Sequence, residues 1–196
     1  MPKGLGEYHS MGARRVLIAI GSNQGDSVAI VRAAMDRLAT FARGGFARSS
    51  LWRTSPVDCP PGSNDYINAA VAFEPVDDLV PEHLLDQLKL LEREFGRAPN
   101  AARNAPRELD LDLLVFGDAC RSTVEFTLPH PRAVDRRFVL APVAEVAPDL
   151  VWPGIGRTVR ELLAALDSNE RVELLHDQVV ASDDLAEGRL TLKGHT

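Results

Sequence analysis

The stretch "APRELDLDLLVFGD", residues 105–118, decides which fold the sequence predicts. Every second residue from Leu109 to Val115 is apolar, which is the period of a β-strand with one face in a core. Asp110 and Asp112 then project together from the opposite face. Two carboxylates held ~5 Å apart repel by about 3 kcal/mol at an effective dielectric of ~20. A strand that keeps them there is expected to use them, and holding cations is the obvious use.

Five further elements are expected before this strand. The first is a central strand at 14–22 that is apolar on both faces. A helix follows the turn at 21–26 and runs to about Phe41, where "RGG" ends it. Strands are expected at 46–54 and 66–74, and then a helix that begins at Pro81 and is capped by Gly96. Residues 55–65 and 97–107 are expected loops, rich in Pro, Gly or polar side chains.

This order is the split βαβ order of a ferredoxin-like α+β fold, βαββαβ. Both helices are expected to cover one face of the sheet and to leave the other face open, with the active site on it. Because residues 66–74 also alternate, Tyr66 and Asn68 should project from the same face as Asp110 and Asp112. Two independent patterns therefore place polar groups on one shared surface.

The remaining regions are less regular. Residues 128–150 mix loop and short helix, and 156–166 are expected to be helical. We expect a flexible leader at 1–13, a single domain at 14–176 and a possible tail at 177–196.

Composition narrows the class of protein. The chain has 196 residues, of which 45% are hydrophobic, and its formal net charge is −6, which argues against a general binder of nucleic acid or of anionic membranes. No segment has the length and apolarity of a signal peptide or a membrane span. Cys59 and Cys120 follow no ligand or disulfide pattern, so we expect inert thiols in a reducing cytoplasm.

Basic side chains gather in sequence around the two aspartates. They are Arg97, Arg103 and Arg107 upstream and His130, Arg132, Arg136 and Arg137 downstream. Carboxylates hold Mg²⁺ with substrate phosphates, and arginine forks neutralise the remaining phosphate oxygens, so the pattern indicates a metal-bound polyphosphate. By itself, however, an Asp-X-Asp pair is as often a solvated strand face, and a single arginine is commonly a surface ion pair.

Other candidate residues also have two interpretations. "GSNQGD" (21–26) is not a Walker phosphate loop, and we expect a turn in which Asn23 fixes nearby loops. His130 lies between two prolines and is either an aimed imidazole or a turn histidine. Tyr66 and Phe138 either belong to the core or sandwich a flat ring.

Six stretches carry a resemblance to a known family. The sequence resembles the 6-hydroxymethyl-7,8-dihydropterin pyrophosphokinases of folate synthesis in "IAIGSNQGD", "SSLWRTSPV", "DYINAAVAFE", "LEREFGR", "RNAPRELDLDLLVFGD" and "LPHPRAVDRRFVLAPVAEVAPDLVWPG". Each stretch alone is weak, whereas six in order across residues 18–154 are highly specific.

The resemblance implies that the chain transfers pyrophosphate from MgATP to the pterin hydroxymethyl group and releases AMP. It assigns two Mg²⁺ ions to Asp110 and Asp112, and catalytic roles on the triphosphate to Arg97 and Arg107. It assigns the pterin to Thr54, Ser55, Val57, Tyr66, Asn68 and Phe138. It assigns the nucleotide to Lys89, Glu92, Arg103, Thr127, His130 and Arg136.

Two other functions stay open on the residues alone. A ferredoxin-like domain could bind a metal–nucleotide as a sensor without catalysis, although such a domain needs no pterin pocket. A two-metal phosphohydrolase would consume ATP without pterin. The expected partners are small-molecule substrates, with no obligate protein partner, nucleic acid or membrane.

Overall fold

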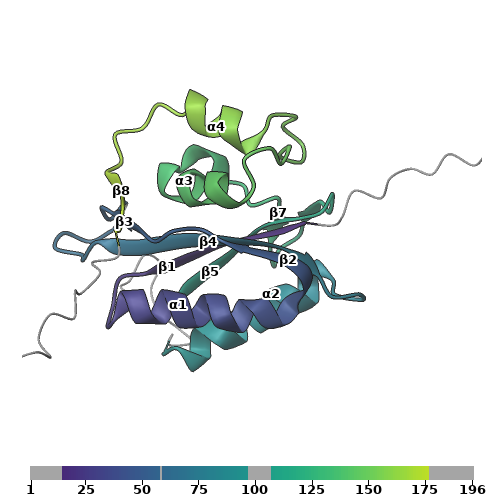
Figure 1. Cartoon of the computed structure of the whole chain (residues 1–196), viewed down its shortest axis with the longest axis horizontal. Helices are drawn as coiled ribbons and strands as arrows, with labels where there is room; N and C mark the ends of the chain where they lie inside the picture. The colour runs from purple at the N-terminus through teal and green to yellow at the C-terminus, as the bar shows by residue number, and fades with distance from the viewer. Residues whose placement is uncertain (1–14, 58, 97–106, 177–196) are drawn as a thin grey trace, which may run out of the picture.

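The computed structural model describes residues 15–57, 59–96 and 107–176, and it has one main β-sheet between two layers of helices (Figure 1). The strands of this sheet are β1 (Val16–Ser22), β2 (Ala42–Arg48), β3 (Trp52–Thr54), β4 (Tyr66–Pro75), β5 (Asp110–Phe116) and β8 (Val172–Leu174). The helices are α1 (Ser27–Leu38), α2 (Pro81–Glu94), α3 (Arg137–Val146) and α4 (Val159–Ala165). Short elements complete the described chain: the 3₁₀ turns at Ala39–Phe41 and Ala133–Asp135 and the hairpin of β6 (Arg121–Ser122) and β7 (Thr127–Leu128).

All strand pairs of the main sheet are antiparallel, in the order β5-β1-β4-β3-β8. The first strand, β1, lies between β5 and β4, and its side chains are buried on both faces, as its sequence predicted. The fold is therefore a mixed α/β arrangement around an antiparallel sheet.

The strand expected at 46–54 is divided in two. β2 pairs with the last part of β4 and β3 with its first part, so both lie along the same edge of β4. Between them, the Ser49 hydroxyl accepts the backbone N–H of Ala70 at 2.8 Å. The Ser49 hydroxyl takes the place of a backbone carbonyl in the pairing with β4, which explains why the strand is interrupted between β2 and β3. The "RGG" expected to end the first helix lies inside β2.

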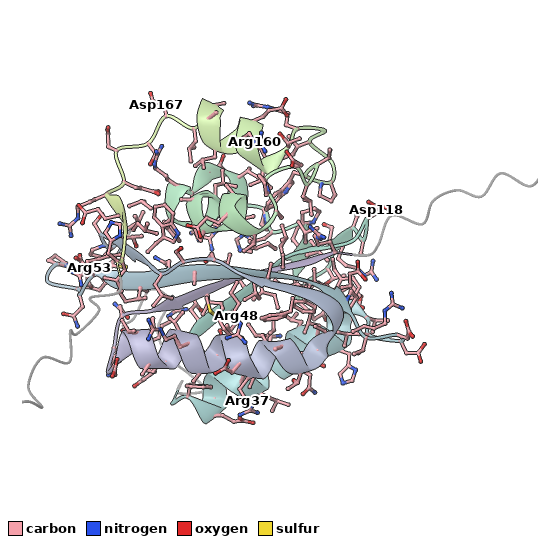
Figure 2. The ribbon with its side chains drawn as sticks, viewed as in Figure 1. Arg37, Arg48, Arg53, Asp118, Arg160 and Asp167 are labelled. Carbon is pink, nitrogen blue, oxygen red and sulfur yellow. The ribbon has the colours of Figure 1, made fainter. Side chains whose placement is uncertain are left out.

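The first face of the sheet packs against α1 and α2 (Figure 1). Leu109, Leu111 and Leu113 join the buried cluster on this face, as the alternation predicted. α1 begins at Asp26, whose carboxylate accepts the N–H of Ala29, and α2 begins at Pro81 as expected. On the outer side, Arg37 of α1 pairs with Glu94 of α2 at 2.8 Å (Figure 2).

The second face is not open, and this part of the prediction was wrong. α3 and α4 pack over it around a second buried cluster that includes Leu17, Ala70, Leu140 and Trp152 (Figure 1). The residues of α3 were expected to be a mixture of loop and short helix, because the helical period is brief there.

A β-bulge corrects one further detail of the aspartate strand. Ile18 pairs with Leu113 and Leu17 with Val115, so Leu114 is the extra residue. Val115 therefore lies in the second cluster instead of continuing the first. Among the described residues, no helix is long and apolar enough to cross a membrane.

Because Leu140 is 0% exposed in α3, Leu140→Ala should lower the free energy of unfolding by about 2–5 kcal/mol. Val124→Ala is the matched control, since Val124 is fully exposed and its truncation should change the free energy by less than about 0.5 kcal/mol. Urea unfolding followed by circular dichroism measures both. Equal midpoints for the two variants would show that α3 is not part of the cooperative unit.

Candidate active site

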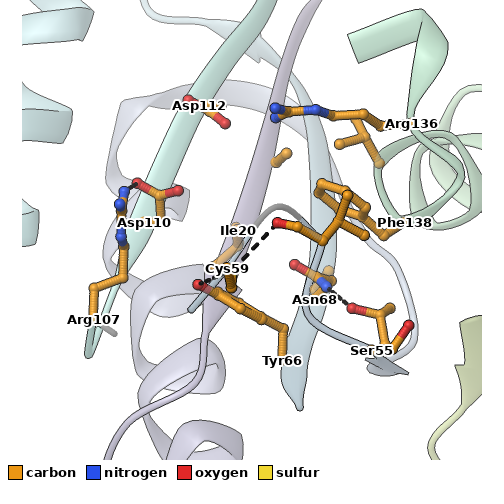
Figure 3. A pocket seen from close by; sticks show the side chains of 16 residues that line it. Ile20, Ser55, Cys59, Tyr66, Asn68, Arg107, Asp110, Asp112, Arg136 and Phe138 are labelled. Atoms are coloured by element: carbon orange, nitrogen blue, oxygen red, sulfur yellow. Dashed lines mark hydrogen bonds and ion pairs between the residues drawn. The ribbon is translucent and has the colours of Figure 1, made fainter. Parts of the chain in front are cut away.

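A pocket lies on the second face of the sheet, beside the start of α3 (Figure 3). Four strands and the first turn of α3 contribute to it. Its lining includes ten residues named from the sequence: Thr54, Ser55, Val57, Tyr66, Asn68, Arg107, Asp110, Asp112, Arg136 and Phe138. The predicted shared surface of β4 and β5 therefore exists, with β1 between them.

The two aspartates of β5 face this pocket from one side of the strand (Figure 3). The Asp110 carboxylate accepts Nη1 of Arg107 at 2.7 Å, in an ion pair whose side chains are 14% (Arg107) and 30% (Asp110) exposed. Burial opposes the charge of Arg107, but Asp110 outweighs it and raises the pKa of Arg107, which stays cationic. The pair therefore places a fixed positive charge beside the aspartates.

Asp112 has no such close ion pair among the contacts described, and Nε2 of His130 lies 4.0 Å away. Burial raises the pKa of Asp112, and the neighbouring Asp110 raises it further, while His130 and Arg136 partly compensate. The ionised carboxylate of Asp112 is thus held in unfavourable surroundings. A bound cation would relieve both causes.

His130 lies behind Asp112 and is not part of the pocket lining. Its backbone N–H donates to the Leu114 carbonyl at 2.9 Å, which fixes it against β5. Burial lowers the pKa of His130 and outweighs the attraction of Asp112, so the imidazole is neutral at pH 7. Its Nδ1 accepts the backbone N–H of Arg132, as a turn histidine does.

The aromatic pair expected from the sequence lines the same pocket. Burial, with a weaker contribution from Cys59, raises the pKa of Tyr66 to about 12, so its hydroxyl keeps its proton at neutral pH. The Arg136 guanidinium lies 5.5 Å from the centre of the Phe138 ring. The two rings reach the pocket from different elements, one from β4 and one from α3.

The polar floor of the pocket comes from β3 and β4. The Asn68 amide donates to the Thr54 hydroxyl at 2.7 Å, and both side chains are buried. A Cβ atom on Gly21 would lie 3.0 Å from Asn68 Oδ1 and 3.8 Å from the Tyr66 ring. Glycine at 21 therefore keeps this part of the pocket open. From the sequence alone, this glycine is expected only at the junction of the strand at 14–22 and the turn at 21–26.

Asn23 forms hydrogen bonds with two segments at the rim of the pocket, which confirms its predicted role in fixing nearby loops. Its side-chain oxygen accepts the N–H of Arg107 at 2.9 Å, and its backbone N–H donates to the Arg107 carbonyl at 3.2 Å. Its carbonyl accepts the amide of Asn64 at 3.2 Å. Cys59, expected to be inert, also lines the pocket, with Sγ 3.8 Å from the Tyr66 hydroxyl.

Besides His130, three described residues expected near the nucleotide do not line the pocket. Lys89 and Thr127 are exposed on α2 and β7. Glu92 is 5% exposed and accepts the backbone N–H of Leu111 at 2.9 Å, so it supports β5 between the two aspartates. Arg97 and Arg103 lie outside the described residues.

The chemistry of the pocket follows from its donors. Within residues 15–57, 59–96 and 107–176, no group of three or more His, Cys, Asp or Glu side chains could enclose a metal ion. A cation on Asp110 and Asp112 would therefore complete its coordination with water and with ligand oxygens, as Mg²⁺ does with phosphates. Arg107 and Arg136 line the same pocket and give it positive charge.

Comparison with known proteins points to one family. Residues 17–148 match the model of the 7,8-dihydro-6-hydroxymethylpterin-pyrophosphokinases. The chain is 41% identical over 165 residues to the 2-amino-4-hydroxy-6-hydroxymethyldihydropteridine pyrophosphokinase of Methylorubrum extorquens, which covers 81% of this chain and 99% of that protein. It is 37% identical over 151 residues to the enzyme of the same name from Synechocystis, covering 77% of this chain and 75% of that one.

Solved structures agree on the fold. A crystal structure of an HPPK-DHPS protein in complex with substrates superposes with a TM-score of 0.59 at 10% identity, covering 78% of this chain and 43% of that chain. A Plasmodium falciparum HPPK-DHPS with pteroate gives a TM-score of 0.59 at 12% identity, covering 77% of this chain and 42% of that chain.

The two aspartates should respond oppositely to neutralisation when divalent cations are removed with EDTA. The fold holds the pKa of Asp112 above its unfolded value of about 4, so the ionised carboxylate destabilises the protein as pH rises through that window. Asp112→Asn should therefore raise the melting temperature at about pH 7, and the gain should shrink toward about pH 4. Asp110→Asn weakens the ion pair with Arg107 and should therefore lower the melting temperature. Differential scanning calorimetry measures both changes. A change in melting temperature of the same sign for both variants at neutral pH would contradict the prediction.

Proposed function

The chain belongs to the 7,8-dihydro-6-hydroxymethylpterin-pyrophosphokinase family, and we propose that the pocket between β5 and α3 binds both of its substrates. The enzyme transfers pyrophosphate from ATP to a hydroxymethyl dihydropterin in folate synthesis. The family and reaction expected from the sequence are confirmed. The proposal for the site rests on one observation: two carboxylates, two aromatic rings and a polar floor line a single pocket.

The sheet supports the finer fold assignment proposed from the sequence. β2 and β3 together count as one interrupted strand, the second of four. The order in the sheet is then β5-β1-β4-β2/β3, with the fourth strand (β5) beside the first (β1) and the third strand (β4) between the first and the second. This is the order of a ferredoxin-like βαββαβ unit. We propose that α3, α4 and β8 extend that unit within one domain at 14–176.

Two Mg²⁺ ions are proposed on Asp110 and Asp112. The fit rests on the donors: both carboxylates line the pocket, and the surroundings of Asp112 disfavour its charge until a cation is near. Once bound, the ions would attach the triphosphate and neutralise the charge that moves with the pyrophosphate. The pleat of β5 keeps the two carboxylates on one face, and Glu92 holds the strand through the backbone N–H of Leu111.

The pterin is proposed to lie between Tyr66 and Phe138, with its polar edge toward Asn68 and Thr54. The lining by Ser55 and Val57 supports this, since both belong to the segment that follows β3. Hydrogen bonds to the pterin edge and stacking on two rings would fix the plane of the substrate. Such fixation aligns the hydroxymethyl oxygen with the phosphate and removes much of the entropic barrier.

The protein itself contributes positioning and charge. We propose that the pterin hydroxyl attacks the β-phosphorus of ATP, that its proton passes to water, and that AMP leaves. We propose that Arg107 and Arg136 neutralise the moving pyrophosphate from the side of the pocket that they line. Arg97 and Arg103 are proposed to act on the nucleotide as well. The neutral His130 is proposed to keep Asp112 in place from behind.

Phosphorus NMR of a completed reaction should show a diphosphate ester on the pterin and an equal amount of AMP. Attack at the β-phosphorus requires this pair of products. A blank reaction without pterin should leave ATP intact, which separates transfer from hydrolysis. ADP with a pterin monophosphate would contradict β-attack, and ATP consumption in the blank would indicate a phosphohydrolase.

Phe138→Ala should weaken pterin binding about 10–100-fold while the affinity for a non-hydrolysable ATP analogue changes less than about twofold. The lost stacking and burial of one aromatic ring corresponds to about 1.5–3 kcal/mol. Isothermal titration calorimetry with each ligand measures the two affinities. Phe126→Ala is a matched control, since Phe126 lies between β6 and β7, packs against the buried cluster on the first face and is absent from the pocket lining. Equal weakening of both ligands by Phe138→Ala would reject the pterin assignment.

A further inference from the structure

The segment 168–175, here called the C-terminal strap, runs beside the pterin side of the pocket. Its central part is β8, which pairs antiparallel with β3 from Trp52–Leu174 to Thr54–Val172 (Figure 1). The strap lies outside residues 17–148, which the family model matches. Its contacts nevertheless reach two of the elements that supply the proposed pterin site, α3 and the loop at 55–65.

The first contact is with α3. The Glu170 carboxylate accepts the backbone N–H of Phe138 at 3.1 Å. Phe138 lies in the first turn of α3, where backbone N–H groups have no acceptor within the helix, and the residue at the N-cap position, Arg136, provides no side-chain cap. Glu170 therefore caps the helix from a distant part of the chain, and its negative charge suits the helix N-terminus. The backbone of the pterin-stacking residue is fixed as a result.

The second contact is with the loop at 55–65. The Arg171 carbonyl accepts the N–H of Ser55 at 3.2 Å, at the start of this loop. The Arg171 side chain donates to Asp65 at 2.7 Å, at its end. One residue therefore holds both ends of the loop that supplies Ser55, Val57 and Cys59 to the pocket.

We propose that Glu170 and Arg171 are positioning residues for the pterin substrate, a role that rests on the proposed placement of the pterin between Tyr66 and Phe138. Adjacent in sequence, they join α3 to the 55–65 loop. The distance between the two walls of the pocket is thereby set before the ligand arrives. Preorganisation of this kind raises affinity by reducing the ordering that binding requires. The nucleotide side, on β5, makes no contact with the strap among those described.

Glu170→Ala should raise the Kd for hydroxymethyl pterin about tenfold, a change of about 1.4 kcal/mol, while the Kd for a non-hydrolysable ATP analogue stays within about twofold. Glu170→Gln should recover most of the affinity, because its amide oxygen can still accept the N–H of Phe138. Glu173→Ala, two residues beyond Arg171 on exposed β8, is the matched control and should bind pterin as the wild type does. Calorimetric titration of the full chain measures each value, and the KM for pterin should rise more than kcat falls.

Arg171→Gln provides a second test, because it leaves intact the hydrogen bonds of the Glu170 carboxylate and of the Arg171 carbonyl. Because the side chains of Arg171 and Asp65 are 53% and 36% exposed, their ion pair is screened by salt. The variant should bind pterin about two- to threefold more weakly than the wild type at low salt, and the difference should vanish near about 1 M salt.

Several results would overturn the proposal. Wild-type pterin affinity in Glu170→Ala would do so, as would equal weakening of both ligands or a Glu170→Gln variant no better than alanine. A salt-independent defect in Arg171→Gln would also reject the role of its ion pair. Failure of the wild type to bind pterin would instead contradict the proposed function, and the role of the strap would fall with it.

Discussion

The repulsion between Asp110 and Asp112 is the constraint around which the pocket is arranged. The pleat of β5 places both carboxylates on the same face, so the strand cannot separate them without losing its register with β1. Arg107 pairs with one of them, and the other has a raised pKa in partly buried surroundings. The fold therefore retains an electrostatic cost that a bound cation and its phosphate ligand would remove.

Rigid support surrounds this unfavourable pair. Glu92 accepts the N–H of Leu111 from α2, and His130 donates its backbone N–H to Leu114 on the same strand. These contacts act on the backbone of β5 and leave the carboxylates facing the pocket. A site that binds charge needs such fixed groups, because flexible ones would reorganise with the ligand and reduce the benefit.

The opposite wall of the pocket depends on chain that lies far from β5 in sequence. α3 brings Phe138 over the sheet through the cluster of Leu140, Val143 and Trp152. The C-terminal strap then joins α3 to the loop after β3 through Glu170 and Arg171. In the proposed arrangement the two substrates have different supports: the edge strand β5 for the nucleotide and its metals, and a helix with a strap for the pterin.

The sequence by itself determined the aspartate face, the polar face of β4, the helix after the turn at 21–26 and the helix that Pro81 begins, because hydrophobic period and capping are local properties. It also identified the family, through motifs spread over the chain. Only the tertiary structure decided that α3 and α4 cover the second face, that a bulge turns Val115 over, and that Glu92 supports β5 instead of lining the pocket. The tertiary structure likewise placed Gly21 and Cys59 in the pocket lining and Glu170 against the backbone of Phe138. Their roles depend on which neighbours lie within a few ångströms across the fold, and no local pattern carries that information.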